Sequence, residues 1–230
     1  MIVGNGMLAQ AFNEYNNNNR IVIFASGVSN SSEKEEQAFQ REIDLVKRII
    51  SKNKDKLFIY FSTCSMYDPL SKDTSYVQHK LQIEKMISSQ SDNFLILRVS
   101  QVFGRSKNAT LLNFLFEKIE HEKQFDLWKN SNRNIISLND IVRITNQLIK
   151  EEKYNQIFHI ANKVYIDIPD LIQLIEKVLN KKAICSLVDK GQKYQIIPND
   201  IESIVDKLNI TFGDDYYFKN LLTFNQSNTE

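Results

Sequence analysis

The sequence predicts an α/β domain in which helices cover both faces of a parallel sheet. Two runs, LFIYFST at 57–63 and NFLILRV at 93–99, are apolar at most positions, which is typical of strands buried on both faces. A helical segment beginning near residue 75 separates them, so strand, helix and strand alternate as in a doubly wound fold. The 230 residues, of which 42% are hydrophobic, suffice for one compact domain with a small C-terminal lobe.

A glycine-containing turn opens the chain. Residues 1–3 are expected to form a short strand, and Gly4, Gly6 and Ala9 match the pattern G-x-G-x-x-G/A. In that pattern the first glycine allows a tight turn, the second lets a pyrophosphate approach the backbone, and the last position lets helix and strand pack closely. The alternative is an ordinary strand-to-helix turn. The residues expected to contact the phosphates of a dinucleotide are Gly4, Asn5, Gly6, Met7 and Leu8.

A second strand and a long helix are expected next, over residues 20–25 and 33–51. The helix carries one apolar face with charged residues opposite, which indicates a scaffold role. The apolar residues that repeat along this face are Phe39, Ile43, Val46 and Ile50.

Tyr76 and Lys80 are candidates for proton transfer. Residues four apart lie on one face of a helix, and a nearby ammonium lowers the pKa of a phenol, which is about 10 in free tyrosine. Tyr76 could then exchange a proton with an alcohol or a carbonyl while a hydride moves. Thr63, at the end of the preceding strand, could orient the same oxygen by a hydrogen bond. Nine tyrosines make a chance Tyr-x-x-x-Lys match expected, so the position of the pair after a buried strand gives the prediction its weight.

These motifs together resemble a known family. FSTCSMY, SYVQHK and LRVSQVFG are similar to the core of the extended short-chain dehydrogenases/reductases, which include nucleotide-sugar epimerases, dehydratases and reductases. The resemblance places the family's strand-end Ser/Thr at Thr63, its Tyr at Tyr76 and its Lys at Lys80. It implies a Rossmann-like fold, NAD or NADP as the cofactor, and a further contact between Lys80 and the nicotinamide ribose.

The sequence departs from this family near its start. IFASGVSNS resembles the family's fourth strand and the loop after it, which implies cofactor contacts by Ala25, Ser26 and Gly27. A full fold has further strand–helix units before this point, including a strand that ends in an acidic residue for the adenosine ribose. No acidic residue lies between Arg20 and Asn30, so we infer that one or two units are deleted. The glycine-motif strand would then form the sheet edge, the adenine side would be poorly covered, and NAD and NADP both stay open. Arg20 could meet a 2′-phosphate or be a solvated loop residue.

Substrate contacts are expected at two positions. The resemblance suggests that Gln101 contacts the substrate or the loop that holds it. Arg133 is the candidate for the diphosphate of a nucleotide sugar, because its planar fork binds phosphate at two points, with a surface arginine as the equal alternative. Family dehydratases carry Asp-Glu just after the Ser/Thr, whereas this chain has Cys64 and Ser65, which disfavours a 4,6-dehydratase.

The second half of the chain is expected to add core elements and a small lobe. An apolar helix is predicted over residues 110–120, and Asn139 is expected to cap a later one. We divide the chain into an NAD(P)-binding core over 1–130, remaining core elements and a substrate lobe over 131–224, and a disordered tail over 225–230.

Charge and composition argue against several classes of function. The net charge of +1 gives no electrostatic reason to expect nucleic acid or an anionic membrane as a partner. No apolar run approaches the roughly 18 residues of a membrane span, and the N-terminus lacks a signal-peptide pattern. Cys64 and Cys185 form neither a disulfide framework nor a metal-binding set, so we expect a cytoplasmic protein without a metal site.

We therefore expect an NAD(P)-dependent oxidoreductase or epimerase that acts on a nucleotide-activated keto sugar in polysaccharide biosynthesis. The alternative is a non-catalytic or sensor-like domain of the same fold that binds NAD(P) or a protein partner. A homodimer is also possible in this scheme, with a neighbouring copy covering the exposed edge strand.

Overall fold

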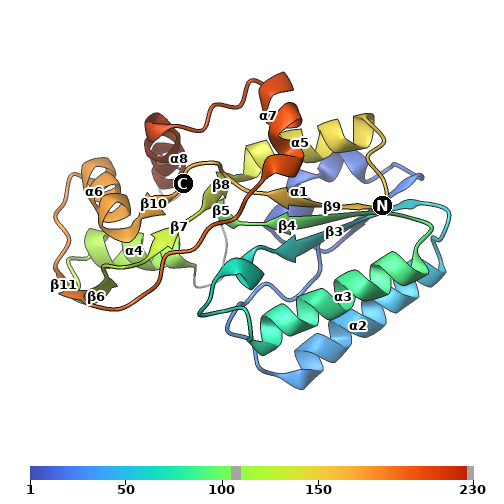
Figure 1. Cartoon of the computed structure of the whole chain (residues 1–230), viewed down its shortest axis with the longest axis horizontal. Helices are drawn as coiled ribbons and strands as arrows, with labels where there is room; N and C mark the ends of the chain where they lie inside the picture. Colours follow the sequence, from blue (N-terminus) through green and yellow to red (C-terminus); the bar gives the residue numbers. More distant parts are fainter. Residues whose placement is uncertain (105–109, 227–230) are drawn as a thin grey trace.

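The computed structural model describes residues 1–104 and 110–226. Its centre is a sheet of five parallel strands in the order β1-β2-β3-β4-β9 (Figure 1). This architecture confirms the predicted α/β class with a parallel sheet between helices. The strands are β1 (Ile2–Val3), β2 (Ile21–Phe24), β3 (Leu57–Thr63), β4 (Asn93–Val99) and β9 (Gln156–Ile160).

Helices pack on both faces of the sheet (Figure 1). One face is covered by α2 (Glu36–Ser51) and α3 (Ser75–Gln90), whose apolar residues meet those of β2, β3 and β4. The other face is covered by α1 (Met7–Ala11), α5 (Leu138–Lys150) and α7 (Glu202–Lys207). Within the described residues, none of the helices combines the length and the apolar composition that a bilayer crossing requires.

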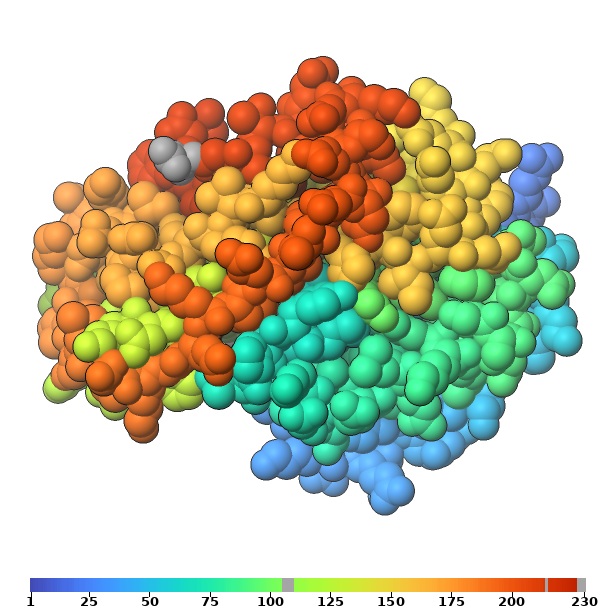
Figure 2. All heavy atoms as spheres, in the orientation of Figure 1, coloured from blue at the N-terminus to red at the C-terminus, as the bar shows by residue number. Residues whose placement is uncertain are grey.

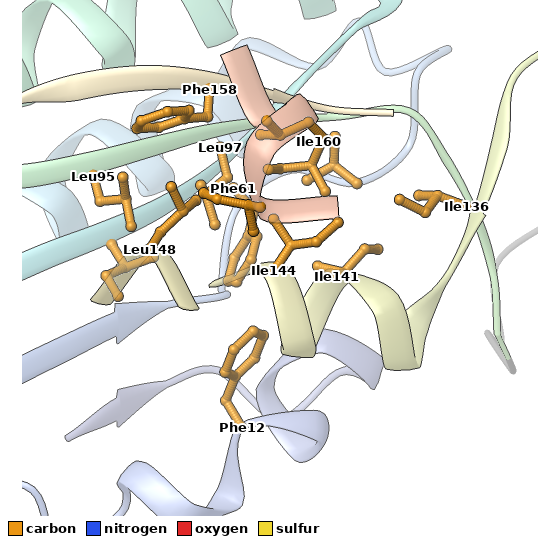
Figure 3. Packing of buried hydrophobic residues seen from close by; sticks show 14 of the residues in the cluster. Phe12, Phe61, Leu95, Leu97, Ile136, Ile141, Ile144, Leu148, Phe158 and Ile160 are labelled. Atoms are coloured by element: carbon orange, nitrogen blue, oxygen red, sulfur yellow. The ribbon is translucent and has the colours of Figure 1, made fainter. Parts of the chain in front are cut away.

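Phe12 anchors the start of the chain on the second face. It is fully buried, and its ring centroid lies 5.5 Å from that of Phe61 on β3. Figure 3 shows it pointing from the end of α1 toward the isoleucines of α5. The α-helix is short: it ends at Ala11, and a 3₁₀ turn over Asn13–Tyr15 follows.

Strand β1 forms an edge of the sheet. In the part of the chain that the structure describes, it pairs only with β2. The loop over 16–20 stands where a full fold of this type has further strand–helix units, in agreement with the inferred deletion. This loop lies at the amino end of the strands, because the Met1 ammonium donates hydrogen bonds to the carbonyl oxygens of Asn18 and Ile21 at 2.8 Å each. The carboxyl end of β1 therefore has no neighbouring strand on its outer side among these residues.

A smaller lobe packs beside the sheet and has its own apolar cluster (Figure 1). The expected boundary at residue 130 does not separate the two parts, since α4 and β6 precede it yet pack in the lobe. Helix α8 continues to Gln226, into the segment expected to be a disordered tail, of which residues 227–230 lie outside the described residues. The lobe elements are α4 (Leu111–Glu120), β6 (Phe125–Trp128), β7 (Asn132–Arg133), β10 (Ile166–Asp167), α6 (Ile168–Leu179), β11 (Cys185–Val188) and α8 (Asp214–Gln226).

The start of α5 ties the lobe to the core, where β5 (Gln101–Phe103) also pairs in parallel with β8 (Ile135–Ser137). Ser137, rather than the expected Asn139, caps α5: its hydroxyl accepts from the N–H of Asp140 at 3.0 Å. The hydroxyl of Tyr216 on α8 donates to the Asp140 carboxylate at 2.7 Å. The first turn of a core helix is thus hydrogen-bonded to the lobe.

The segment over 189–198, which we call the strap, leads from β11 toward the 3₁₀ turn η3 (Asn199–Ile201). Figure 2 shows it in orange across the front of the molecule, between the lobe and the teal segment. The side-chain amide of Asn132 exchanges two hydrogen bonds with the backbone of Tyr194, at 3.1 and 3.2 Å. The Tyr165 hydroxyl donates to the carbonyl oxygen of Ile196 at 2.9 Å. These contacts fix the strap to the lobe.

Replacing Phe12 by Ala should destabilise the protein strongly, because it leaves a cavity between α1, α5 and the sheet. Truncation of a fully buried phenylalanine typically costs about 3–5 kcal/mol in the free energy of unfolding. Urea unfolding followed by circular dichroism measures this loss. Phe114 on α4 is the control, because it is 41% exposed and its replacement by Ala should cost less than about 1 kcal/mol. Equal losses for the two variants would contradict the anchoring role of Phe12.

Candidate active site

A cavity of about 680 Å³ opens at the carboxyl ends of β2, β3 and β4. Ligands bind at such strand ends in open α/β sheets, and this volume is in the range of small-molecule sites. Of the residues predicted from the sequence, Gly4, Asn5, Gly6 and Ser26 do not line the cavity. Those that do are Met7, Leu8, Ala25, Gly27, Thr63, Tyr76, Lys80, Gln101 and Arg133.

Tyr76 lies in the first turn of α3, where Thr74 caps the helix. Tyr76 and Thr63 line the same cavity, so the strand end and the helix meet as predicted. The Thr63 hydroxyl donates to Oγ of Ser65 at 2.9 Å. Burial raises the pKa of Tyr76 to about 12, and the nearby Glu42 carboxylate acts in the same direction, while the Thr63 hydroxyl opposes them. The expectation that Lys80 lowers this pKa is therefore wrong for this arrangement.

Lys80 lies one turn further along α3 and is buried. Its Nζ is 3.3 Å from Oε1 of Glu42 and donates to the Tyr60 hydroxyl at 3.0 Å, while the centroid of the Tyr76 ring is 6.0 Å away. Burial lowers the pKa of the Lys80 ammonium, and the Glu42 carboxylate acts in the opposite direction. Because Glu42 balances the ammonium charge, little of that charge acts on the Tyr76 phenol.

Glu42, on α2, is the counter-ion that the sequence did not reveal. It is fully buried and accepts hydrogen bonds from the Tyr60 hydroxyl at 2.7 Å and the N–H of Val28 at 2.6 Å. Nε2 of His79 lies 2.9 Å from its second oxygen. Burial favours the protonated carboxyl, but the hydrogen bond to His79 and the charge of Lys80 outweigh it and lower the pKa of Glu42 to about 2. Every oxygen of this carboxylate thus has a partner inside the protein.

One signal in the sequence could have identified Glu42. It lies three residues after Phe39 and four before Val46, on the face of α2 that was assigned to apolar packing. A carboxylate on an apolar face must find a partner or remain neutral, because an unpaired buried charge is costly. The helix is therefore more than the scaffold that its pattern suggested.

Two glycines are required by close approaches of the backbone. At Gly27, an added Cβ would lie 2.6 Å from Nζ of Lys80 and 2.7 Å from Oε1 of Glu42. Gly4 has φ of +125°, and a Cβ there would lie 2.4 Å from the carbonyl oxygen of Ala25. A Cβ at Gly6, by contrast, would meet no other described atom within 4 Å. The glycine turn thus packs tightly on the end of β2 and leaves open space above Gly6, which fits the approach of a pyrophosphate.

The far end of the cavity carries polar groups from the lobe and the strap. Gln101 and Arg133 line it as predicted, together with Tyr194 of the strap, which the sequence did not suggest. Ser100 also lines it, and its Oγ is buried without a hydrogen-bond partner among the described residues. A buried hydroxyl without a partner is costly, so a polar group of a ligand at this position would stabilise the site.

Cys64 stands where a catalytic carboxylate would be needed to eliminate water. Its thiol is buried and donates to the carbonyl oxygen of Arg98 at 3.1 Å, and burial raises its pKa. The thiol therefore stays protonated and unreactive at neutral pH.

Replacing Glu42 by Gln should destabilise the protein, because it leaves Lys80 buried without its counter-ion. Removing one partner of a buried pair typically costs about 3–5 kcal/mol in the free energy of unfolding at pH 7. The pKa of Glu42 is lower in the folded protein than its ordinary value of 4.5, so its contribution is present above pH 4.5 and is lost as the pH falls toward 2. Urea unfolding at several pH values should show the wild-type and E42Q stabilities converging in that range.

The matched control for this experiment is Glu117→Gln. Glu117 pairs with Lys123 at 2.8 Å, but both side chains are at least half exposed, so their pairing is screened by solvent. We expect no measurable change in the stability of E117Q at pH 7. A stability for E42Q that stays parallel to the wild type down to pH 2 would contradict the role of the buried pair.

The comparisons with known proteins agree with this geometry. A profile of the family described as RmlD substrate binding domain matches residues 51–198. No curated protein matches the chain. Among solved structures, UDP-N-acetylglucosamine 4-epimerase from Bacillus cereus is similar over 96% of this chain and 80% of its own, with a TM-score of 0.72 and 18% identity.

Two further structures illustrate the range of similar proteins. The dTDP-glucose 4,6-dehydratase from Bacillus anthracis, solved in complex with NAD, is 11% identical over 91% of this chain and 73% of its own, with a TM-score of 0.71. RMD from Pseudomonas aeruginosa, solved with NADPH, is 12% identical over 91% of this chain and 82% of its own, with a TM-score of 0.70. The fold is therefore that of the extended short-chain dehydrogenases/reductases, and the chain belongs to the RmlD substrate binding domain family.

Proposed function

We propose that this protein is an NAD(P)-dependent oxidoreductase that reduces a keto group of a nucleotide-activated sugar. The observation that carries this proposal is that the hydroxyl-bearing side chains of Tyr76 and Thr63 both line a cavity at the carboxyl ends of parallel strands. Such a pair can hold a carbonyl oxygen and give it a proton. The similar structures solved with NAD and NADPH support the choice of cofactor.

The residues present fit the nicotinamide end of this cofactor. When bound, the cofactor supplies the hydride. The turn before Met7 and Leu8 would carry its pyrophosphate, where Gly6 leaves open space. Gly27 allows the backbone after β2 to lie against Lys80, whose ammonium would donate to the nicotinamide ribose. Met7, Leu8, Gly27 and Lys80 line the same cavity as Tyr76, whereas Gly6 does not.

The state of Tyr76 favours the reductive direction. Burial raises the pKa of Tyr76, so at pH 7 the phenol is protonated and can donate a proton to a carbonyl oxygen. An epimerase must also remove a proton from an alcohol, for which the phenolate is needed. The charge balance between Lys80 and Glu42 gives the phenolate little support. A reductase therefore fits this site better than an epimerase.

The substrate would lie at the lobe end of the cavity. The guanidinium of Arg133 suits a diphosphate, since it can bind two phosphate oxygens at once. Gln101 and the unpartnered hydroxyl of Ser100 would bind sugar oxygens. Cys64 and Ser65 provide no carboxylate next to Thr63, which argues against the elimination of water by a 4,6-dehydratase.

Replacing Tyr76 by Phe should lower turnover by about 100-fold or more, because the proton donor is lost while packing is kept. The assay is the consumption of NADH or NADPH at 340 nm with a UDP- or dTDP-linked 4-keto sugar. The matched control is Tyr15→Phe, whose hydroxyl bonds Asn146 at 2.9 Å outside the cavity and whose loss should change turnover less than about twofold. Undiminished turnover in Y76F would remove Tyr76 from the mechanism.

The rate of reduction should be independent of pH between about 6 and 10. The acid is active below its pKa, so activity is lost only as the pH rises toward about 12. Single-turnover rates with saturating cofactor and substrate measure this directly. A rate that falls around pH 7 would show that the phenol has a lowered pKa and that the charge of Lys80 reaches it.

The second candidate is a domain that binds NAD(P) without reacting. The ion pair that engages Lys80 with Glu42 and the burial of Tyr76 favour it. Micromolar binding of NADH without turnover of any keto sugar nucleotide would support this candidate over the reductase.

A further inference from the structure

At the cofactor end of the cavity, β1 is the edge strand, and its outer side pairs with no other strand among the described residues. In a full-length sheet, a strand next to the glycine-motif strand carries an acidic residue that binds the adenosine ribose, or an arginine that binds its 2′-phosphate. Among the described residues, β1 has β2 as its single neighbour. The position at which a dinucleotide's adenosine is normally held is thus bordered by no strand within residues 1–104 and 110–226.

The loop that replaces the missing units does not reach this position. It runs over 16–20 and is held at the amino end of the sheet by the Met1 ammonium. Arg20 is exposed and immediately precedes β2, whose four residues span about 13 Å before the strand reaches the cavity. The idea that Arg20 meets a 2′-phosphate is therefore contradicted by its place in the fold.

Among the described residues, no charged side chain at the cavity replaces the acidic residue or arginine that would bind the adenosine ribose or its 2′-phosphate. Three charged side chains line it among the described residues: Asp68, Lys80 and Arg133. Lys80 pairs with Glu42, and Asp68 accepts from the N–H of Leu70 at 2.9 Å and from the Ser71 hydroxyl at 3.0 Å. Arg133 lies on β7, in the lobe. The loop after β2 contributes uncharged lining residues, namely Val28, Ser29, Asn30, Ser31 and Ser32.

We propose that cofactor recognition ends at the pyrophosphate: the chain holds the nicotinamide mononucleotide half and leaves the adenosine in solvent. It then takes NADH, NADPH and reduced nicotinamide mononucleotide with similar affinity. This inference rests on the proposed function, since it concerns the same site. Gly27 and Lys80 approach each other closely at the cofactor end, and in this proposal they contact the nicotinamide half, where the binding free energy would arise.

The test is calorimetric titration of the full chain with these three reduced cofactors, and with ADP-ribose as the probe for the adenosine half. The expected dissociation constants of NADH and NADPH agree within about threefold, and that of reduced nicotinamide mononucleotide lies within about tenfold of them, which corresponds to 1.4 kcal/mol. ADP-ribose should bind at least about tenfold more weakly than reduced nicotinamide mononucleotide. A dinucleotide preference beyond tenfold, or a larger difference between NADH and NADPH, would overturn the inference.

Arg20→Ala supplies a second, independent arm, because the hydrogen bonds of Arg20 with Asn18 and Leu57 use its backbone and not its side chain. We expect the affinity of R20A for NADPH to be unchanged, and a selective loss of NADPH affinity beyond about tenfold would show that the loop reaches the ribose. If the proposed function itself is wrong, none of the reduced cofactors binds, while circular dichroism shows that the chain is folded. Binding of NADH with little affinity for the mononucleotide overturns the inference and leaves the oxidoreductase proposal standing.

Discussion

A carboxylate and an ammonium meet under the cavity, where water does not reach them. Glu42 on α2 and Lys80 on α3 are both buried, and Tyr60 of β3 bonds to each of them. Burying two charges is favourable only when the remaining hydrogen-bonding positions are filled, and the N–H of Val28 and the ring of His79 fill those of Glu42. Two helices, one strand and the loop after β2 are thus held in one arrangement, which also explains why residue 27 has no side chain.

This ion pair shapes the chemistry of the site through electrostatics. A free ammonium beside Tyr76 would favour its phenolate, whereas a neutralised one leaves burial as the dominant influence. Burial keeps the phenol protonated, and Tyr76 lines the cavity together with Thr63.

The lobe and the strap complete the cavity from the side opposite the glycine turn. Tyr216 bonds the first turn of α5, and the Asn132 side chain bonds the backbone of Tyr194. Both contacts join segments far apart in the sequence, so the substrate end of the site exists only when the lobe is docked. The cofactor end depends on short-range packing between the glycine turn and β2 instead. In the proposed reductase, the shortened sheet leaves the adenosine side of the site without a neighbouring strand among the described residues.

The sequence by itself determined the alternation of strands and helices, the turn at Gly4, and the meeting of Thr63, Tyr76 and Lys80. These follow from local patterns, because apolar runs specify buried strands and parallel strands present their carboxyl ends at one edge. The tertiary structure alone decided the partner of Lys80, since a charge on the apolar face of α2 acquires its role from the rotation of that helix against α3. It also decided the interleaving of core and lobe and the place of Tyr194 in the cavity. Contacts between distant segments depend on packing in three dimensions, which no local pattern of residues encodes.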